Sequence, residues 1–102
     1  MNNSLKDNNM KTLMKAILSL ETEEECWSFF EDLCTVSELK SMSQRLDVAM
    51  KLKRGDVYTD IAEKTGASTA TISRVSRALS YGANGYNTVL ERLENKWNTT
   101  FW

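Results

Sequence analysis

Hydroxyl and guanidinium side chains recur in one segment, residues 68–77, that contains no acidic residue. At 100° per residue of an α-helix, Ile72 and Val75 mark an inward apolar face, and small, hydroxylated and basic side chains cover the opposite side. Short side chains let a helix approach the floor of the DNA major groove, where hydroxyl and guanidinium groups hydrogen-bond to base edges and phosphates. We therefore predict that double-stranded DNA is contacted by Ser68, Thr69, Ala70, Thr71, Ser73, Arg74 and Arg77.

A second basic group, which includes Lys53 and Arg54, precedes this segment. Residues 40–80 carry eight basic and four acidic side chains, although the net charge of the whole chain is −1. A locally basic surface attracts a polyanion, and we predict that Lys53 and Arg54 contact phosphates. Two alternatives stay open: the same residues suit the negative end of a helix dipole, and they also fit an ordinary solvated surface of mixed charge.

Residues 58–79 have the spacing of a helix-turn-helix, which would place these side chains on one exposed face. Thr59 is expected to cap a short first helix, and the small Ala62 allows the two helices to cross closely. Gly66 stands where the chain must turn with positive φ, and Ser68 is expected to cap the second helix. Two amphipathic helices of an ordinary bundle are the alternative interpretation.

The remaining sequence predicts further helices and no sheet. The chain has no proline and four glycines, and no segment alternates apolar and polar residues long enough to indicate a strand. Apolar spacing predicts a helix over residues 10–20, and a capping box at Thr22 opens a second. A third begins at Thr35 or Ser37 and ends at Gly55 in the left-handed conformation. The expected fold class is all-α.

A chain of 102 residues is long enough for one domain, and a domain of this size buries only a modest fraction of its surface by itself. Large apolar residues crowd the first two helices, and we expect Trp27, Phe29 and Phe30 to lie in the core or in a dimer contact. A homodimer is therefore predicted. The expected organisation is a flexible N-terminus over residues 1–9, a single DNA-binding domain over 10–94, and a tail over 95–102. In that tail, Trp97, Phe101 and Trp102 are expected to dock on the body or on a partner.

Several function classes find no support in the composition. The chain lacks histidine, and two cysteines, Cys26 and Cys34, cannot build a four-ligand zinc site. No enzyme activity, metal or cofactor is expected. No apolar run reaches the length of a membrane span, and the N-terminus has no signal-peptide core, so a cytoplasmic protein is predicted. A sequence-specific regulator and a helical interaction or dimerisation module without specific DNA binding are the two functions that remain.

Three blocks of sequence resemble the Trp repressor superfamily, and more closely its YerC/YecD branch of small bacterial regulators. They are residues 29–35, residues 44–49 and, most specifically, residues 66–75, whose Ala-Thr-Ile-Ser-Arg nearly matches the start of the family's recognition helix. The resemblance implies an intertwined, all-helical homodimer with a central core and two helix-turn-helix heads. It also implies a DNA-binding transcriptional regulator, expected to be a repressor that is associated with the nucleoid in the cytoplasm of a bacterium.

The resemblance also implies a candidate effector pocket, since the family's corepressor, L-tryptophan, lies between that core and the recognition helix. The matching positions are Thr35, Arg45, Thr71, Arg74 and Val75. The alternative for Arg45 and Arg74 is that they are a structural arginine and a phosphate contact. Val75 stands where the family has a glycine, Ala78 replaces a serine, and the turn before the motif is one residue shorter. Three added carbons in a packed site cost about 1–3 kcal/mol. We therefore expect L-tryptophan not to bind, and a smaller effector or none to act instead.

Overall fold

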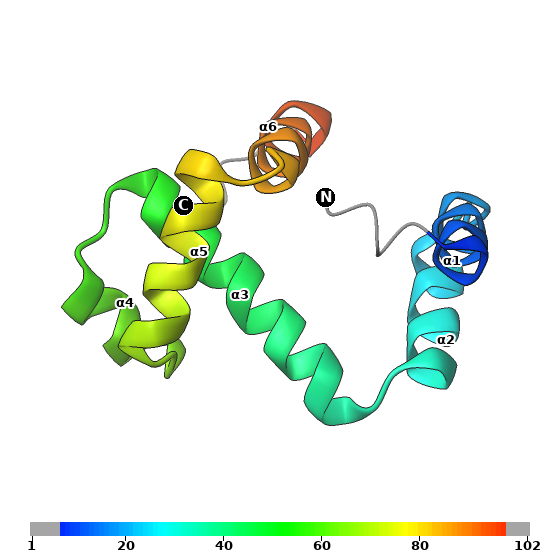
Figure 1. Ribbon diagram of the computed structural model, residues 1–102, viewed down its shortest axis with the longest axis horizontal. Helices are drawn as coiled ribbons and strands as arrows, with labels where there is room; N and C mark the ends of the chain where they lie inside the picture. The colour runs from blue at the N-terminus through cyan, green and yellow to red at the C-terminus, as the bar shows by residue number, and fades with distance from the viewer. Residues whose placement is uncertain (1–6, 98–102) are drawn as a thin grey trace. The chain divides into compact units, whose positions relative to one another are not determined.

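Residues 7–97 of the computed structural model are described here, and they are helical with short connections (Figure 1). The helices are α1 (Asn8–Leu18), α2 (Glu23–Leu33), α3 (Val36–Arg54), α4 (Tyr58–Thr65), α5 (Thr69–Tyr81) and α6 (Gly85–Trp97). The all-α prediction is confirmed, since no strand occurs within residues 7–97. No helix in this range is long and apolar enough to cross a membrane. The chain divides into two compact units, one up to Leu39 and the other from Lys40 onward.

Local hydrogen bonds set the ends of the first two helices. α1 begins at Asn8, two residues earlier than predicted, because the Asp7 carboxylate accepts a 2.7 Å bond from the Met10 amide. α2 is capped as predicted, with the Thr22 hydroxyl accepting from the Glu25 amide at 3.1 Å. Asp7 and the next two residues, expected to be flexible, thus form the cap and first turn of α1.

A complete capping box starts α3 and decides between the two predicted starts in favour of Thr35. The Thr35 hydroxyl accepts from the Glu38 amide at 3.1 Å, and the Glu38 carboxylate accepts from the Thr35 amide at 2.8 Å. The hydrogen bond from the Thr35 amide to the Glu38 carboxylate, and after it the influence of the Thr35 side chain on that carboxylate, holds the pKa of Glu38 below its ordinary value. Gly55, with φ of 95°, ends the helix in the left-handed region as predicted.

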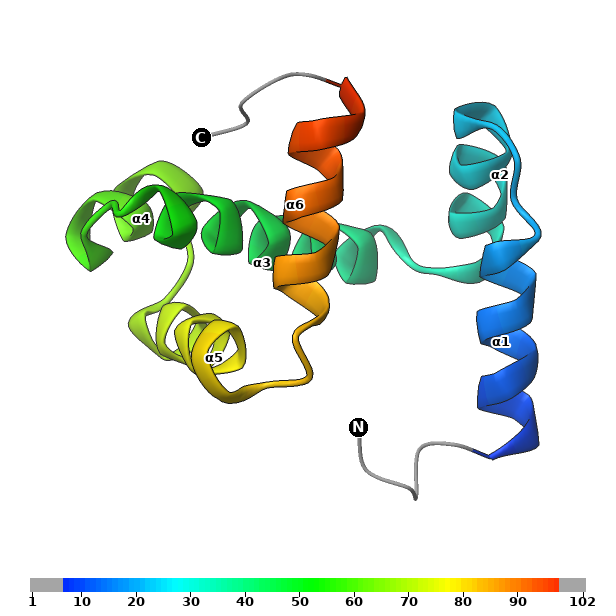
Figure 2. The ribbon, with the colours of Figure 1, turned by 90° about the horizontal axis from the view of Figure 1, so that it is seen from above.

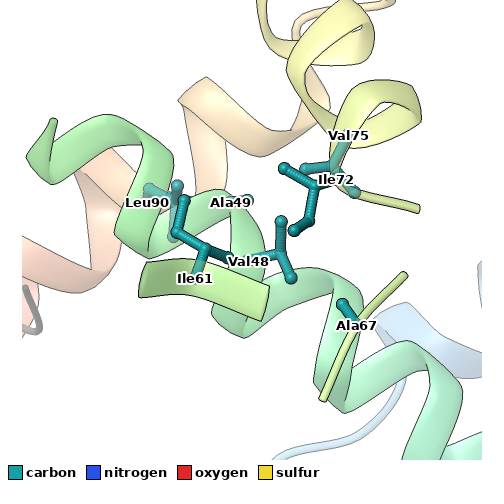
Figure 3. Close-up of a cluster of buried hydrophobic side chains, with 7 residues drawn as sticks. All are labelled: Val48, Ala49, Ile61, Ala67, Ile72, Val75 and Leu90. Carbon is teal, nitrogen blue, oxygen red and sulfur yellow. The ribbon is translucent and has the colours of Figure 1, made fainter. Parts of the chain in front are cut away.

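The second unit has an apolar core to which all four of its helices contribute. Seven buried apolar side chains point toward one another in Figure 3: Val48, Ala49, Ile61, Ala67, Ile72, Val75 and Leu90. They come from α3, α4, the turn after α4, α5 and α6. Figure 2 shows α6 running across α3 within this unit. The core thereby packs α4 and α5 against α3 and α6.

α1 ends at Leu18, two residues before the predicted end, and boundaries of three later helices also differ from the prediction. α4 starts at Tyr58 and its cap position is Val57, whose carbonyl accepts from the Ile61 amide at 3.1 Å, so Thr59 lies inside the first turn and does not cap. α5 continues past Leu79 to Tyr81. α6 reaches Trp97, so the expected tail starts inside a helix; the predicted docking of Phe101 and Trp102 lies outside the described residues.

Candidate nucleic-acid interface

α4, a three-residue turn and α5 form the predicted helix-turn-helix. Gly66 has φ of 74°, and its amide donates to the Ala62 carbonyl at 2.9 Å, which ends α4. Ser68 caps α5 as predicted, since its hydroxyl accepts from the Thr71 amide at 3.1 Å. The turn between these two residues is therefore specified by a positive-φ glycine on one side and a hydroxyl cap on the other.

A side-chain hydrogen bond that the sequence analysis missed joins the end of α4 to α3. The Gln44 amide nitrogen donates to the Thr65 carbonyl at 3.2 Å, across 21 positions of sequence. The Thr65 hydroxyl donates to the Ile61 carbonyl at 2.7 Å and accepts from the Ala67 amide at 3.1 Å. Gln44 lies one helical turn before the buried Val48, so both side chains lie on the same face of α3. A polar residue at such a position was the sequence signal that could have indicated this contact.

The outer face of α5 has the character that the helical spacing predicted. Its exposed members are Ser68, Thr69, Ala70, Ser73, Arg74 and Arg77. Within residues 7–95, neither arginine forms an ion pair. Thr71 differs, because it is half-buried and its hydroxyl accepts a 3.1 Å bond from Ser68. The guanidinium groups and the hydroxyls of Thr69 and Ser73 can donate to bases and phosphates, whereas the Ser68 and Thr71 hydroxyls bond to each other at the cap.

Lys53 and Arg54, both predicted to contact phosphates, have different surroundings. Lys53 is exposed and has no ion pair among the described residues. The Arg54 guanidinium donates to the Asp56 carboxylate through two nitrogens, one of them at 2.8 Å, and Lys64 lies 3.9 Å from the same carboxylate. The hydrogen bond from Arg54 holds the pKa of Asp56 below its ordinary value and raises that of Arg54. Asp56 thus ties Arg54 to the start of the helix-turn-helix, a role that the sequence analysis did not predict.

The five predicted effector-pocket residues are divided between the units. Thr35 belongs to the first unit and caps α3, while the other four belong to the second. Arg45 is half-buried on α3, and Arg74 is exposed on α5. Val75 is 1% exposed and is a member of the apolar core (Figure 3). Its side chain therefore fills space within the protein, in contact with other core residues. Among the described residues, no group of three or more His, Cys, Asp or Glu side chains could hold a metal ion.

Comparison with known proteins agrees with this architecture. The sequence profile of a family described as Trp repressor protein matches residues 8–94. The Bacillus subtilis protein YerC is 49% identical over 90 residues, which cover 88% of this chain and 86% of YerC.

Two crystal structures show the same fold. One is a TrpR-like protein from Eubacterium eligens, 56% identical with a TM-score of 0.86, covering 90% of this chain and 95% of that one. The other, from Staphylococcus aureus, is 49% identical with a TM-score of 0.85, over 89% of this chain and 91% of that one. The resemblance noted in three blocks of sequence thus extends over nearly the whole described chain, and the protein belongs to the Trp repressor family.

Proposed function

We propose that the protein is a sequence-specific DNA-binding transcription regulator, a repressor, that acts as a homodimer through its helix-turn-helix. The observation that carries this proposal is the outer face of α5, where exposed hydroxyl and guanidinium groups stand without an acidic neighbour on the helix. The core holds that helix from behind through Ile72 and Val75, so the face is presented rigidly. Membership in the Trp repressor family supports the same assignment, as does the S. aureus relative, whose description refers to a Trp repressor.

The proposed dimer follows from apolar side chains that the chain leaves in water. Leu18 is 83% exposed and Trp27 is 69% exposed, and Met14 and Leu33 are exposed as well. A second copy would bury them, and a two-fold dimer presents two α5 helices. We therefore expect a near-palindromic DNA site with half-sites one helical turn apart. Such a regulator would act in the bacterial cytoplasm in association with the nucleoid.

Binding of DNA is tested by recovering bound genomic fragments and measuring affinity on the enriched duplex. We expect Arg77→Ala to weaken binding to that duplex by about 1–3 kcal/mol, because a guanidinium contact to a base edge is lost. Lys53→Ala should instead weaken all duplexes equally and flatten the dependence on salt, since fewer counterions are released. Unchanged affinity of the Arg77 variant would show that the assigned face is wrong.

The alternative function is a helical interaction module without specific DNA binding. The exposed apolar residues of α1 and α2 are the observation that favours it. The two functions differ in their response to salt, because true DNA binding falls steeply as salt rises and a largely apolar protein interface does not. Retention on duplex DNA over a salt gradient therefore distinguishes them.

For regulation, we propose that L-tryptophan is not the effector. Val75 occupies core space where the family's glycine leaves room beside the indole. Arg45 and Arg74 could still bind an anionic group of a smaller molecule, because guanidinium groups form paired hydrogen bonds with carboxylates.

Calorimetry with millimolar L-tryptophan should show no saturable signal, and a dissociation constant in the range of tens of micromolar would contradict the proposal. If the valine is the main obstacle, Val75→Gly should gain affinity; if it does not, Ala78 or the shortened turn is the better explanation.

A further inference from the structure

Tyr81, the last residue of α5, lies on the same outer face as the predicted DNA contacts. At 100° per residue it is rotated by about 20° from Ala70 and Arg74, and by about 40° from Arg77. Its side chain is 88% exposed, the highest value among the large apolar side chains of the described residues. Its hydroxyl has no hydrogen-bond partner among them. A phenol with a free donor thus extends the row of guanidinium groups.

The end of α5 is held firmly enough to position this phenol. The Asn87 side chain donates to the Leu79 carbonyl at 3.1 Å and to Asn84 at 3.0 Å, which ties α5 to the start of α6. Gly82 turns the chain immediately after Tyr81, with its amide donating to the Ala78 carbonyl at 2.9 Å. A Cβ at Gly82 would lie 2.5 Å from that carbonyl oxygen, so the close turn requires glycine. The backbone of Tyr81 is therefore fixed on both sides.

Distance along the helix decides what part of a duplex Tyr81 can reach. Tyr81 follows Thr69 by twelve residues, or about 18 Å along the helix axis. The major groove is about 12 Å wide, and a recognition helix contacts base edges with its N-terminal residues. With those residues in the groove, the last turn of α5 lies beyond the base edges and over the sugar–phosphate backbone. Tyrosine hydroxyls are among the groups that hydrogen-bond to phosphate oxygens there.

We propose that the Tyr81 hydroxyl donates a hydrogen bond to a phosphate of the bound duplex and so fixes the C-terminal end of α5 on the DNA. The proposal rests on the proposed DNA-binding function and adds a contact independent of base sequence. Tyr81 is thus a positioning residue, whereas Arg77 discriminates between sequences. Because a phenol is uncharged, its contact releases no counterion and should leave the salt dependence of binding unchanged.

The test compares full-length wild type, Tyr81→Phe and Tyr81→Ala, with Ser80→Ala as the matched control. Ser80 is exposed and adjacent, but it points about 100° away from Tyr81. Affinity is measured by fluorescence anisotropy on the enriched duplex and on a random-sequence duplex, at several salt concentrations. We expect Tyr81→Phe to weaken both by the same factor, about tenfold, with an unchanged salt slope. Tyr81→Ala should weaken both at least as much, and Ser80→Ala should behave as wild type.

Four outcomes would overturn the proposal. Tyr81→Phe with wild-type affinity for both duplexes excludes the hydrogen bond. A loss confined to the enriched duplex assigns Tyr81 to base recognition. A change of oligomeric state in sedimentation assigns it to a protein interface. If wild type binds neither duplex, the proposed DNA-binding function is overturned, and this contact with it. If wild type binds and Arg77→Ala weakens binding but Tyr81→Phe does not, only the Tyr81 contact is overturned.

Discussion

The two units of the chain differ in how far they bury their apolar side chains. The second unit buries seven apolar side chains, whereas no described residue of the first unit, 7–39, is buried. Leu18 and Trp27 of the first unit stay largely in water. Phe29 and Phe30 contact each other edge-on, with ring centroids 5.5 Å apart, but are only half-buried. One unit thus completes a core, and the other leaves its large apolar residues exposed, on the surface that the proposed dimer would cover.

The largest expected effect is loss of core packing in the second unit. Ile61→Ala should lower the free energy of unfolding by about 2–5 kcal/mol, because Ile61 is fully buried and its removal leaves a cavity. Urea unfolding followed by circular dichroism measures the change. Val57→Ala, at a neighbouring residue that is 60% exposed, is the control and should cost far less. Equal costs for the two variants would contradict the core assigned to this unit.

The exposed residues of the first unit should act through association. Leu18→Glu places a charge on the surface proposed to be covered by the partner chain, and should weaken dimerisation by about 2 kcal/mol or more, roughly thirtyfold. Sedimentation equilibrium measures it, with Lys15→Glu as a charge control on the exposed surface of the same helix. A folded wild-type monomer at micromolar concentration would refute the dimer itself.

The same contrast explains which parts of the structure the sequence could predict. Caps and turns depend on neighbouring residues, so Thr22, Gly55, Gly66 and Ser68 were identified correctly. The start of α4 was missed because Val57 offers no side-chain cap.

Two side-chain contacts that depend on the folded path of the chain could not be derived in this way. The bond from Gln44 to Thr65 joins residues 21 positions apart, and the pairing of Arg54 with Asp56 depends on how the chain turns after Gly55. Helical spacing did predict the outer face of α5, but the expected end at Leu79 left Tyr81 out of consideration.

A smaller effect on stability should come from the hydrogen bond between Gln44 and Thr65. Gln44→Ala removes the hydrogen bond to the Thr65 carbonyl and should cost about 1 kcal/mol of stability, less than loss of a core side chain. Amide hydrogen exchange at Gly66 and Ala67 should rise more than elsewhere in the second unit, because the turn loses its anchor to α3. Ser43→Ala, at the exposed preceding position, is the control. Exchange that rises equally in both variants would show that Gln44 does not hold the turn.

The smallest effect concerns the two carboxylates with lowered pKa values, Glu38 in the first unit and Asp56 in the second. A carboxylate whose pKa is lower in the folded state stabilises the fold above its unfolded pKa, and this contribution is lost as pH falls through the folded pKa. Stability should therefore decline below about pH 4, near the ordinary values of Asp and Glu. Asp56→Asn should reduce this decline, because it removes a group that Arg54 holds ionised. The free energy of unfolding measured between pH 3 and pH 7 gives the comparison, and identical declines in wild type and Asp56→Asn would show that the pair with Arg54 adds no stability.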